Sequence, residues 1–174
     1  MAADRLVTLR AFERDDAERY RRWVNDPEIG AFIDRGQPVS PEEHARWYEA
    51  LVSAESNRVF AVDDAGGTFV GLVWLYGIHR RHRRAEVRIV IGERKAWGTG
   101  VGTEALRRVS DIAFDTLGLE KLWADVLVTN PRAVASFEKA GFVREGLLRG
   151  DRAAASGRVD VVRLGRLRGE QARP

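Results

Sequence analysis

The stretch that decides the fold is residues 94–104, Arg-Lys-Ala-Trp-Gly-Thr-Gly-Val-Gly-Thr-Glu. Its glycines, Gly98, Gly100 and Gly102, alternate directly after a strongly apolar run over 87–91 and directly before a segment with helical spacing. Because glycine has no Cβ, this backbone can turn tightly and direct several N–H groups at one point. The positive end of the following helix adds to the attraction for an anion. A strand, a glycine-rich turn and a helix in that order predict a binding site for a pyrophosphate.

Two common phosphate-binding motifs do not fit this turn. A mononucleotide P-loop needs a Gly-Lys pair, and the chain has none. The dinucleotide motif Gly-x-Gly-x-x-Gly needs its third glycine one residue later and opens a βαβ unit, whereas this turn lies past the middle of the chain. The pattern that does fit is Lys95-x-x-Gly98-x-Gly100.

The composition indicates a globular chain without thiol or metal chemistry. With 174 residues and 44% apolar content, it fits one domain over 1–174, with a core over 5–167 and a frayed tail at 169–174. It has no cysteine, and its three histidines form no His-Glu-x-x-His pair, so we expect no disulfide and no metal site. No apolar run is long enough to cross a membrane, and residues 1–10 lack an apolar signal core, so we expect a cytoplasmic protein.

An arginine-rich segment at 79–84, His-Arg-Arg-His-Arg-Arg, lies between two apolar runs in a chain of net charge +3. The favoured interpretation is a solvated loop. A nucleic-acid-binding patch is the alternative, and the absence of interleaved aromatic residues for base stacking weakens it.

Hydrophobic periodicity and capping residues divide the chain into strands and helices. We expect strands over 6–10, 58–62, 68–76, 86–91, 122–128, 142–148 and 158–167, and helices over 15–25, from Ser40, from the glycine turn to Leu117, and over 130–139. The order β-α-α-β-β-β-α-β-α-β-β predicts a mixed α/β sheet with helices on both faces. The crossover from 86–91 to 122–128 should join two parallel neighbours.

The second half of the chain carries a dense series of motifs. They are Trp-Gly-Thr-Gly-Val-Gly-Thr-Glu-Ala-Leu at 97–106, Leu-Glu-Lys-Leu-Trp-Ala-Asp-Val at 119–126, Asn-Pro-Arg-Ala at 130–133 and Phe-Glu-Lys-Ala-Gly-Phe-Val-Arg-Glu-Gly at 137–146. Together with Lys95-x-x-Gly98-x-Gly100, they resemble the GNAT superfamily of acyl-CoA-dependent N-acetyltransferases, in the branch that holds ribosomal-protein N-terminal and spermidine acetyltransferases. The resemblance implies the GNAT fold, a mostly antiparallel sheet with a splayed parallel pair. It also implies acetyl-CoA as cofactor and direct transfer of an acetyl group to a primary amine.

The resemblance further implies where the cofactor would bind. The strand before the turn would pair with the pantetheine arm, provided that the sheet splays and leaves an edge free. The N–H groups of the turn would bind the pyrophosphate, while Asn130 is either a cofactor contact or only a helix cap, and Arg132 either reaches a phosphate or is solvated. The expected cofactor-binding residues are Ile89, Val90, Ile91, Lys95, Trp97, Gly98, Thr99, Gly100, Val101, Gly102, Thr103, Asn130 and Arg132.

Glu86 is the expected catalytic base or water-orienting residue. An amine with an ordinary pKa of about 10 must lose a proton before it attacks the thioester. Glu86 opens the strand that leads to the turn, where the family often places a glutamate, and Arg84 and Arg88 are expected to tune it. A surface carboxylate paired with those arginines is the alternative. By the same resemblance, the backbone N–H of Val90 would polarise the thioester carbonyl.

Position 137 departs from the family pattern. Many relatives carry a tyrosine where this chain has Phe137, which cannot protonate the leaving thiolate. Ser136 points about 100° away around the helix and is a poor substitute. Since a thiol has a pKa of about 8.5, water can serve as the acid or the thiolate can leave unaided. Asp125 on the neighbouring strand either binds an ammonium group or is structural.

Two other classes of function stay open at this point. One is a non-catalytic acyl-CoA-binding module, which Phe137 keeps in consideration, and the other is a ribosome- or RNA-associated protein that uses residues 79–84. The acceptor amine is equally open: a protein N-terminus, a polyamine, an amino sugar or another small amine. A polyamine should need clustered carboxylates, whereas the early acidic residues are scattered, namely Asp26, Glu28, Asp34, Glu42 and Glu43. A homodimer is expected by analogy, and no membrane partner is expected.

Overall fold

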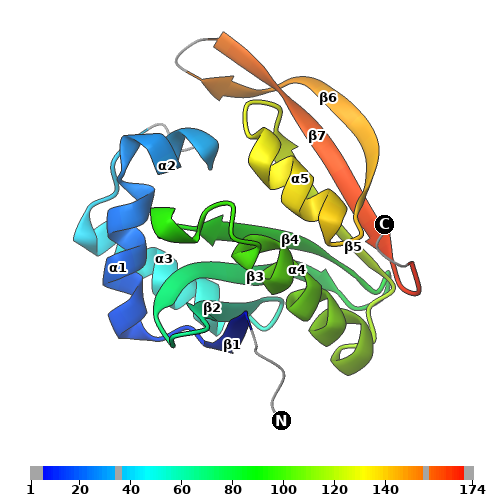
Figure 1. Ribbon diagram of the computed structural model, residues 1–174, viewed down its shortest axis with the longest axis horizontal. Coiled ribbons are helices and arrows are strands. Elements are labelled where there is room, and N and C mark those ends of the chain that lie inside the picture. The colour runs from blue at the N-terminus through cyan, green and yellow to red at the C-terminus, as the bar shows by residue number, and fades with distance from the viewer. Residues whose placement is uncertain (1–5, 34–36, 155–156, 171–174) are drawn as a thin grey trace.

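The computed structural model describes residues 6–33, 37–154 and 157–170 (Figure 1). Its strands form one seven-stranded sheet in the order β1-β2-β3-β4-β5-β7-β6. The strands are β1 Val7–Ala11, β2 Arg58–Asp64, β3 Phe69–His79, β4 Arg84–Ile91, β5 Lys121–Leu127, β6 Val143–Ala154 and β7 Gly157–Leu167. All neighbours are antiparallel except β4 and β5, which are parallel. The expected mixed, mostly antiparallel sheet and its parallel pair are confirmed.

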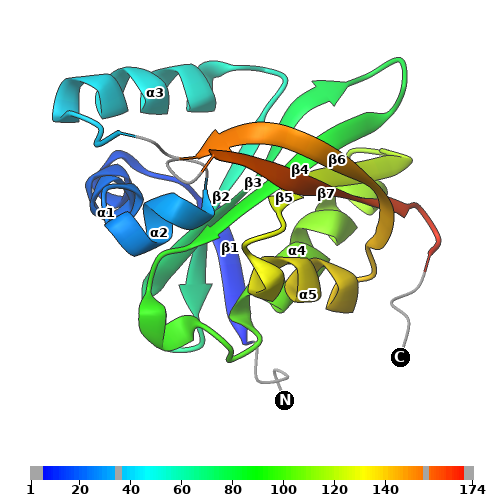
Figure 2. The ribbon, with the colours of Figure 1, turned by 90° about the horizontal axis from the view of Figure 1, so that it is seen from above.

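Helices cover the two faces of the sheet unequally. They are α1 Arg14–Val24, α2 Pro27–Phe32, α3 Pro41–Ser53, α4 Val101–Asp111 and α5 Pro131–Lys139, with a π-helical turn at Ile112–Thr116 that continues α4. The helices α1, α2 and α3 lie on one side of the sheet, and α4 and α5 lie on the other (Figure 2). Two apolar cores result, one around Leu72 and Trp74 under the first three helices and one around Leu106 and Leu122 under α4 and α5. None of the described helices is long and apolar enough to span a bilayer.

Helix α2 was not expected from the sequence. The tripeptide Asn25-Asp26-Pro27 does end α1, as expected, but it also begins a second helix. The Asp26 side chain accepts hydrogen bonds from the N–H groups of Glu28 and Ile29, and Pro27 occupies the first helical position. The same residues therefore stop one helix and cap the next. As a result, Phe32 comes to lie against the glycine turn, 6.4 Å from Trp97 between ring centroids.

Helix α3 begins as the sequence predicts. The Ser40 side chain accepts the Glu43 N–H at 3.2 Å, and the Glu43 side chain accepts the Ser40 N–H at 2.9 Å. His44 is buried, and Trp47 stacks on Tyr20 at 5.2 Å between ring centroids. These aromatic residues build the core, as expected, and hold α3 against α1.

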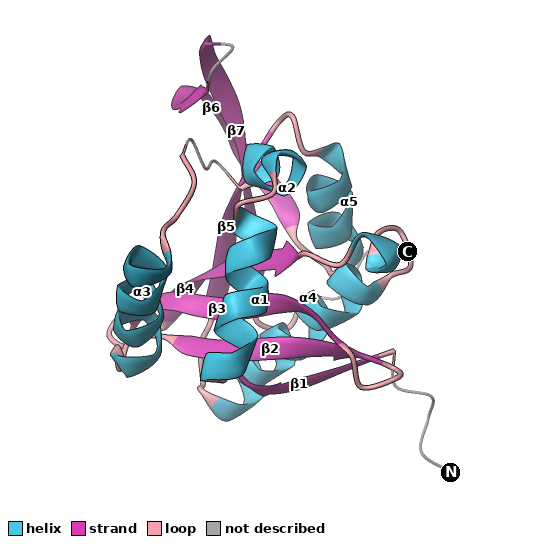
Figure 3. Ribbon diagram, turned by 90° about the vertical axis from the view of Figure 1, so that its left-hand side faces the viewer, coloured by secondary structure: helices cyan, strands magenta, loops and turns pink. Residues whose placement is uncertain are grey.

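The hairpin of β6 and β7 is longer than expected. A loop was expected to follow residue 148, but β6 continues to Ala154. The pairing with β7 explains the extension, since Ala154 faces Gly157 and the Gly150 N–H donates to the Asp160 carboxylate at 2.6 Å. A shift in register between Leu148 and Arg152 absorbs the irregular residues. Figure 3 shows this hairpin extending beyond the rest of the sheet.

The arginine-rich segment 79–84 is the turn between β3 and β4. Its side chains are exposed, as expected for a solvated loop. The Arg83 carbonyl accepts the N–H groups of Glu120 and Lys121 at 2.6 and 3.2 Å. The segment thereby joins the start of β4 to the start of β5, where the parallel pair begins.

Candidate active site

The two halves of the sheet separate between β4 and β5. These strands pair over three residues only, from Arg84 with Lys121 to Glu86 with Trp123. Beyond Glu86, β4 stays on β3 as far as Ile91, whereas β5 stays on β7. The expected splay is therefore confirmed, and beyond Glu86 it leaves one edge of β4 without a strand partner among the described residues.

The register of β3 and β4 decides which backbone groups face this gap. The Gly92 N–H donates to the Val70 carbonyl at 3.0 Å, which fixes one hydrogen-bonded pair of the ladder. Bonded and non-bonded pairs alternate in an antiparallel ladder, so Val90 is also turned toward β3, while Ile89 and Ile91 are turned toward the gap. The expected assignment of the Val90 N–H as the carbonyl-polarising donor is thus wrong, because that group points into the sheet. The donor that faces the gap is the N–H of Ile89.

The backbone of Ile91 already has one partner. The Trp97 indole N–H donates to the Ile91 carbonyl at 2.6 Å, which anchors the glycine turn to the end of β4. This bond also shows that the Ile91 carbonyl points away from β3. It leaves the N–H of Ile91 facing the gap.

The glycine turn leads into α4, whose first N–H groups can donate hydrogen bonds to a ligand. Gly98 and Gly100 have positive φ angles of 76° and 93°, and Gly100 caps α4 without any side-chain hydrogen bond. The first N–H groups of a helix have no partner inside the helix, so those of residues 101–103 are available to an anion. The N–H groups of Trp97 and Thr99 donate instead to carbonyls within the turn, at 3.0 and 3.4 Å. The set of free donors is therefore narrower than the sequence predicts.

One cavity of about 810 Å³ connects the turn, the free edge of β4, α5 and α2. This volume lies within the usual range for small-molecule sites, about 300–1,000 Å³. Of the residues expected from the sequence, Ile89, Val90, Ile91, Trp97, Gly98, Thr99, Gly100, Gly102, Thr103, Asn130 and Arg132 line it. Lys95 and Val101 line a neighbouring cavity of about 490 Å³ instead, and Glu86 lines neither.

Other lining residues were missed by the sequence reasoning. They include Leu6, Ile29, Phe32, Ile33, Ala96, Glu104, Leu106, Arg107, Ala133, Ala135, Ser136 and Lys139. Helix spacing could have found some of them, because Arg107 lies four residues after Thr103 and Lys139 three after Ser136. The Arg107 guanidinium donates to the Lys139 carbonyl at 2.9 Å, which ties α4 to α5 at the cavity wall. No short-range pattern could have brought α2 to this wall, because tertiary packing places it there.

The chemistry of the cavity suits coenzyme A. Its apolar strand edge offers backbone groups to an amide-containing arm, and its helix terminus offers N–H groups to phosphates. A Cβ placed on Gly102 would lie at ordinary contact distance, 3.6 Å from Ile91 Cγ1 and 3.9 Å from Ser136 Oγ, so it would fit but would take up space at this wall of the cavity. Basic side chains of Arg107, Arg132 and Lys139 also line the cavity.

Asn130 and Arg132 fix the start of α5. The Asn130 side chain accepts the Ala133 N–H at 3.1 Å, so it is a helix cap that also lines the cavity. The Arg132 guanidinium lies 3.8 Å from the centre of the Trp97 ring and 5.4 Å from that of Phe32. Arg132 is exposed, and its guanidinium also connects α5 to the glycine turn and to α2.

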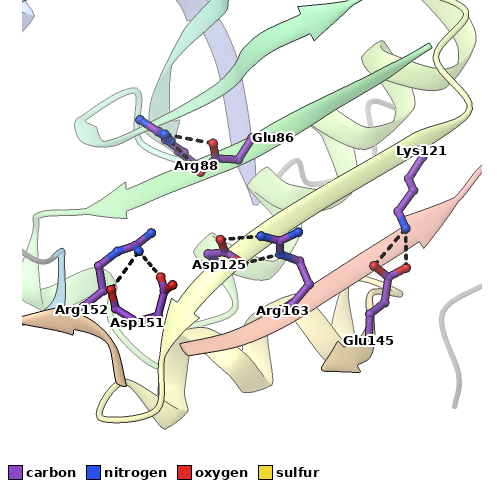
Figure 4. Close-up of polar contacts among 8 residues, drawn as sticks. All are labelled: Glu86, Arg88, Lys121, Asp125, Glu145, Asp151, Arg152 and Arg163. Carbon is purple, nitrogen blue, oxygen red and sulfur yellow. Dashed lines mark hydrogen bonds and ion pairs between the residues drawn. The ribbon is translucent and has the colours of Figure 1, made fainter. Parts of the chain in front are cut away.

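Glu86 lies on the face of β4 that is turned away from α4 and α5. Its side chain is 13% exposed and accepts two hydrogen bonds from Arg88, at 2.7 and 2.9 Å (Figure 4). Of the two arginines expected beside Glu86, Arg84 and Arg88, it is Arg88 that binds the carboxylate. Asp125 on β5 is bound in the same way by Arg163, through two hydrogen bonds of which one measures 2.9 Å.

Phe137 does not face the cavity. Its side chain is buried and packs edge-on against Phe142, 5.0 Å between ring centroids. Ser136, which the sequence reasoning set aside as a substitute acid, is the neighbour that lines the cavity.

Comparison with known proteins agrees with this geometry. Residues 6–143 match the family described as an acetyltransferase (GNAT) domain. The chain is 34% identical over 142 residues to a spermidine N(1)-acetyltransferase of Vibrio cholerae, covering 82% of each chain. It is 31% identical over 148 residues to that of Escherichia coli, covering 85% of this chain and 78% of the relative.

A solved structure extends the likeness to three dimensions. The crystal structure of spermidine N-acetyltransferase from Vibrio cholerae in complex with CoA and spermine superimposes with a TM-score of 0.86 at 32% identity. The match covers 95% of this chain and 97% of that one. The chain therefore belongs to the GNAT family, and it is an N-acetyltransferase that uses acetyl-CoA as its acetyl donor.

Proposed function

We propose that the enzyme moves the acetyl group from acetyl-CoA directly to a primary amine across the gap between β4 and β5. The observation that carries this proposal is the splay itself, because it puts the free edge of β4 and the start of α4 on one cavity. Coenzyme A would lie on the α4 and α5 side, with its pyrophosphate on the N–H groups of residues 101–103. The chain has no cysteine to carry an acetyl group, which favours direct transfer.

The amine would approach from the other face, where Glu86 lies. We propose Glu86 as the base that takes a proton from the ammonium form of the acceptor, directly or through one water molecule. The nitrogen lone pair then attacks the thioester carbon, and the Ile89 N–H binds the oxygen on which negative charge develops. Glu86 is held by Arg88, so that ion pair must open before the carboxylate can receive the proton.

The collapse of the intermediate completes the transfer. The nitrogen–carbon bond remains, the carbon–sulfur bond breaks, and the thiolate leaves with the electron pair. The nitrogen loses its second proton to water, and the thiolate takes up a proton from water, so the two transfers balance. Phe137 has no role in this step, because it lies in the core and carries no ionisable group.

The identity of the acceptor is a separate question. Because two of the relatives are spermidine N(1)-acetyltransferases, spermidine is the first amine to test, alongside peptide N-termini, amino sugars and small amines. A single domain over 1–174, a cytoplasmic location and a homodimer stay predictions. Exposed apolar side chains on and beside the β6–β7 hairpin, Val128, Val143, Leu147 and Leu167, support self-association.

The test is the release of thiol from acetyl-CoA with these amines, measured for the wild type and for Glu86→Gln. We expect the substitution to lower kcat at neutral pH by about 10²–10⁴-fold, because a positioned base is lost, and to leave the binding of acetyl-CoA unchanged. Activity of the variant should then rise with pH as the amine deprotonates in solution.

The matched control is Glu49→Gln, which changes an exposed carboxylate on α3 that pairs with Arg14 at the surface. It should leave the kinetics unchanged. A Glu86→Gln enzyme with the wild-type pH–rate profile would remove Glu86 from the proposed mechanism.

A further inference from the structure

The side of the sheet that Glu86 faces carries alternating charges. Residues such as Val87 and Ala124 belong to the core under α4 and α5, so the residues beside them on each strand point the other way. We call this surface the charged face; it consists of Tyr76 on β3, Glu86 and Arg88 on β4, Trp123 and Asp125 on β5, and Arg163 on β7. The core under α1, α2 and α3 reaches Trp74 and Val90 but does not include these residues.

Two ion pairs on neighbouring strands form the centre of this face (Figure 4). Glu86 holds Arg88, and Asp125 holds Arg163. The hydrogen bond with Asp125 raises the pKa of Arg163, burial opposes that effect, and the charge of Glu86 adds to it. The two pairs are therefore one electrostatic unit that spans the splayed strands.

The positive groups of this unit are the outer ones. The side chains of Glu86 and Asp125 are 13% and 12% exposed, whereas those of Arg88 and Arg163 are 42% and 35% exposed. Each guanidinium also lies over an aromatic ring, Arg88 at 4.0 Å from the centre of Tyr76 and Arg163 at 4.3 Å from that of Trp123. A ligand that arrives from solvent therefore meets two cations before it meets a carboxylate.

This arrangement does not favour a polyamine. A polycation needs free carboxylates, but those of the charged face each hold a guanidinium already. Of the early acidic residues, Asp26 and Glu28 both bind Arg94 on the glycine turn. Asp34 lies outside the described residues. A polyamine would have to displace the guanidinium groups from these carboxylates, and Arg88 and Arg163 would then lie beside it as like charges, which opposes its binding.

We propose that the acceptor is an amine that carries a carboxylate close to its nitrogen, as an α-amino acid does, and that Arg88 and Arg163 bind this carboxylate. The inference rests on the proposed function, whose acceptor it specifies. The ligand's carboxylate takes the outer guanidinium groups, and its ammonium takes the oxygens of Glu86 and Asp125. Each charge keeps a partner throughout this exchange, so no unpaired charge is created.

The exchange also explains how the base is released. Glu86 is engaged by Arg88 through two hydrogen bonds. When the acceptor's carboxylate takes over Arg88, the Glu86 carboxylate is left beside the acceptor's ammonium group and can receive its proton. An amine without a carboxylate lacks the group that draws Arg88 away. Selection and activation of the acceptor thus depend on the same arginine.

The experiment compares matched amines in the thiol-release assay. Each α-amino acid of a panel is paired with the amine that lacks its carboxylate, for example phenylalanine with phenethylamine and leucine with isoamylamine, and spermidine serves as the polycation. We expect at least one amino acid to exceed both its partner amine and spermidine in kcat/KM by about tenfold or more, as the loss of a charge-assisted contact implies.

Variants at position 88 link this preference to the charged face. Arg88→Met keeps the apolar stem over Tyr76 and removes the charge. It should raise KM for the amino acid by about tenfold and raise kcat/KM for its partner amine, because Glu86 is no longer held by Arg88. Arg88→Lys keeps a charge and should restore part of the preference. The control Arg80→Met also removes one positive charge, but from the exposed β3–β4 turn. It should leave the kinetics of both the amino acid and its partner amine unchanged.

Equilibrium binding in the presence of coenzyme A separates this inference from the proposed function. The wild type could bind the amino acid but not its partner amine, lose this binding in Arg88→Met, and acetylate no amine at all. That result would support the inference and overturn the proposed chemistry. A wild-type enzyme that prefers spermidine or the partner amines would overturn the inference. So would an Arg88→Met enzyme that keeps the wild-type preference.

Discussion

At the scale of single residues, two glycines of the glycine turn have different roles. Gly100 has a φ of 93°, a region that residues with a Cβ rarely adopt, so its role is conformational. Gly102 is helical, and a Cβ there would project toward Ile91 and Ser136 at the cavity wall. We propose that its role is to leave space for a ligand.

Alanine at each position should distinguish these roles. Gly100→Ala should lower the free energy of unfolding by about 1–2 kcal/mol because of backbone strain. Gly102→Ala should retain or slightly raise it, since alanine is the better helix former by about 0.5–1 kcal/mol, while weakening the binding of coenzyme A. Chemical denaturation and calorimetric titration with coenzyme A measure the two effects. Unchanged affinity in Gly102→Ala would show that the ligand does not approach this wall.

At the scale of elements, β4 belongs to two environments at once. One edge is paired with β3 along its length, while the other is paired with β5 only as far as Glu86. Beyond Glu86, the N–H and C=O groups of one residue are therefore hydrogen-bonded to β3, and those of the next residue face the gap. This alternation makes β4 the element that would bind the cofactor's arm as an added strand.

Amide hydrogen exchange of β4, followed by NMR, tests this assignment. The N–H groups of Ile89 and Ile91 should exchange rapidly in the free enzyme and become protected when coenzyme A is added, because the ligand would bind to this edge. The Val90 N–H, which is turned toward β3, should be protected in both states. Protection of Val90 alone on adding ligand would mean that the register has been misassigned.

At the scale of the whole molecule, one arginine ties three elements on the side of β1. Arg10 on β1 binds Asp16 on α1 at 2.6 and 2.8 Å and Asp63 on β2 at 2.8 Å. Burial tends to raise the pKa of Asp16, but the hydrogen bonds from Arg10 and from the Glu13 N–H outweigh that effect and hold the pKa below 3.8. A carboxyl group whose pKa is lowered by folding stabilises the protein above its unfolded pKa. That stability is lost as the pH falls through the folded value.

Asp16→Asn should therefore lower the free energy of unfolding by about 1–3 kcal/mol at pH 7, with a deficit that shrinks below about pH 4. Denaturation curves of variant and wild type at several pH values measure this difference. Asp15→Asn, an exposed neighbour in the same helical turn, is the matched control and should have little effect. A deficit that stays constant from pH 7 to pH 3 would assign the loss to packing instead of charge.

Much of the fold follows from local sequence. The alternation of apolar residues, the caps at Ser40 and Asn130 and the glycines at 98–102 specify most elements and the glycine turn, because these signals act over a few residues. The sequence did not reveal α2, since Asp26-Pro27 serves as the end of one helix and the start of another. It also did not reveal the full length of β6, whose last residues are strand only because β7 pairs with them.

By itself, then, the sequence determined the order of most elements, the glycine turn and the position of Glu86 near the start of β4. Only the tertiary structure decided which backbone groups are free, because the register between β3 and β4 turns Ile89 toward the gap and Val90 away from it. It also decided that Asp125 pairs with Arg163, since this contact joins β5 to β7. The contact of Glu86 with Arg88, two residues further along the same strand, was expected from the sequence. Spacing along a chain specifies local conformation, whereas contacts between strands depend on how distant segments pack.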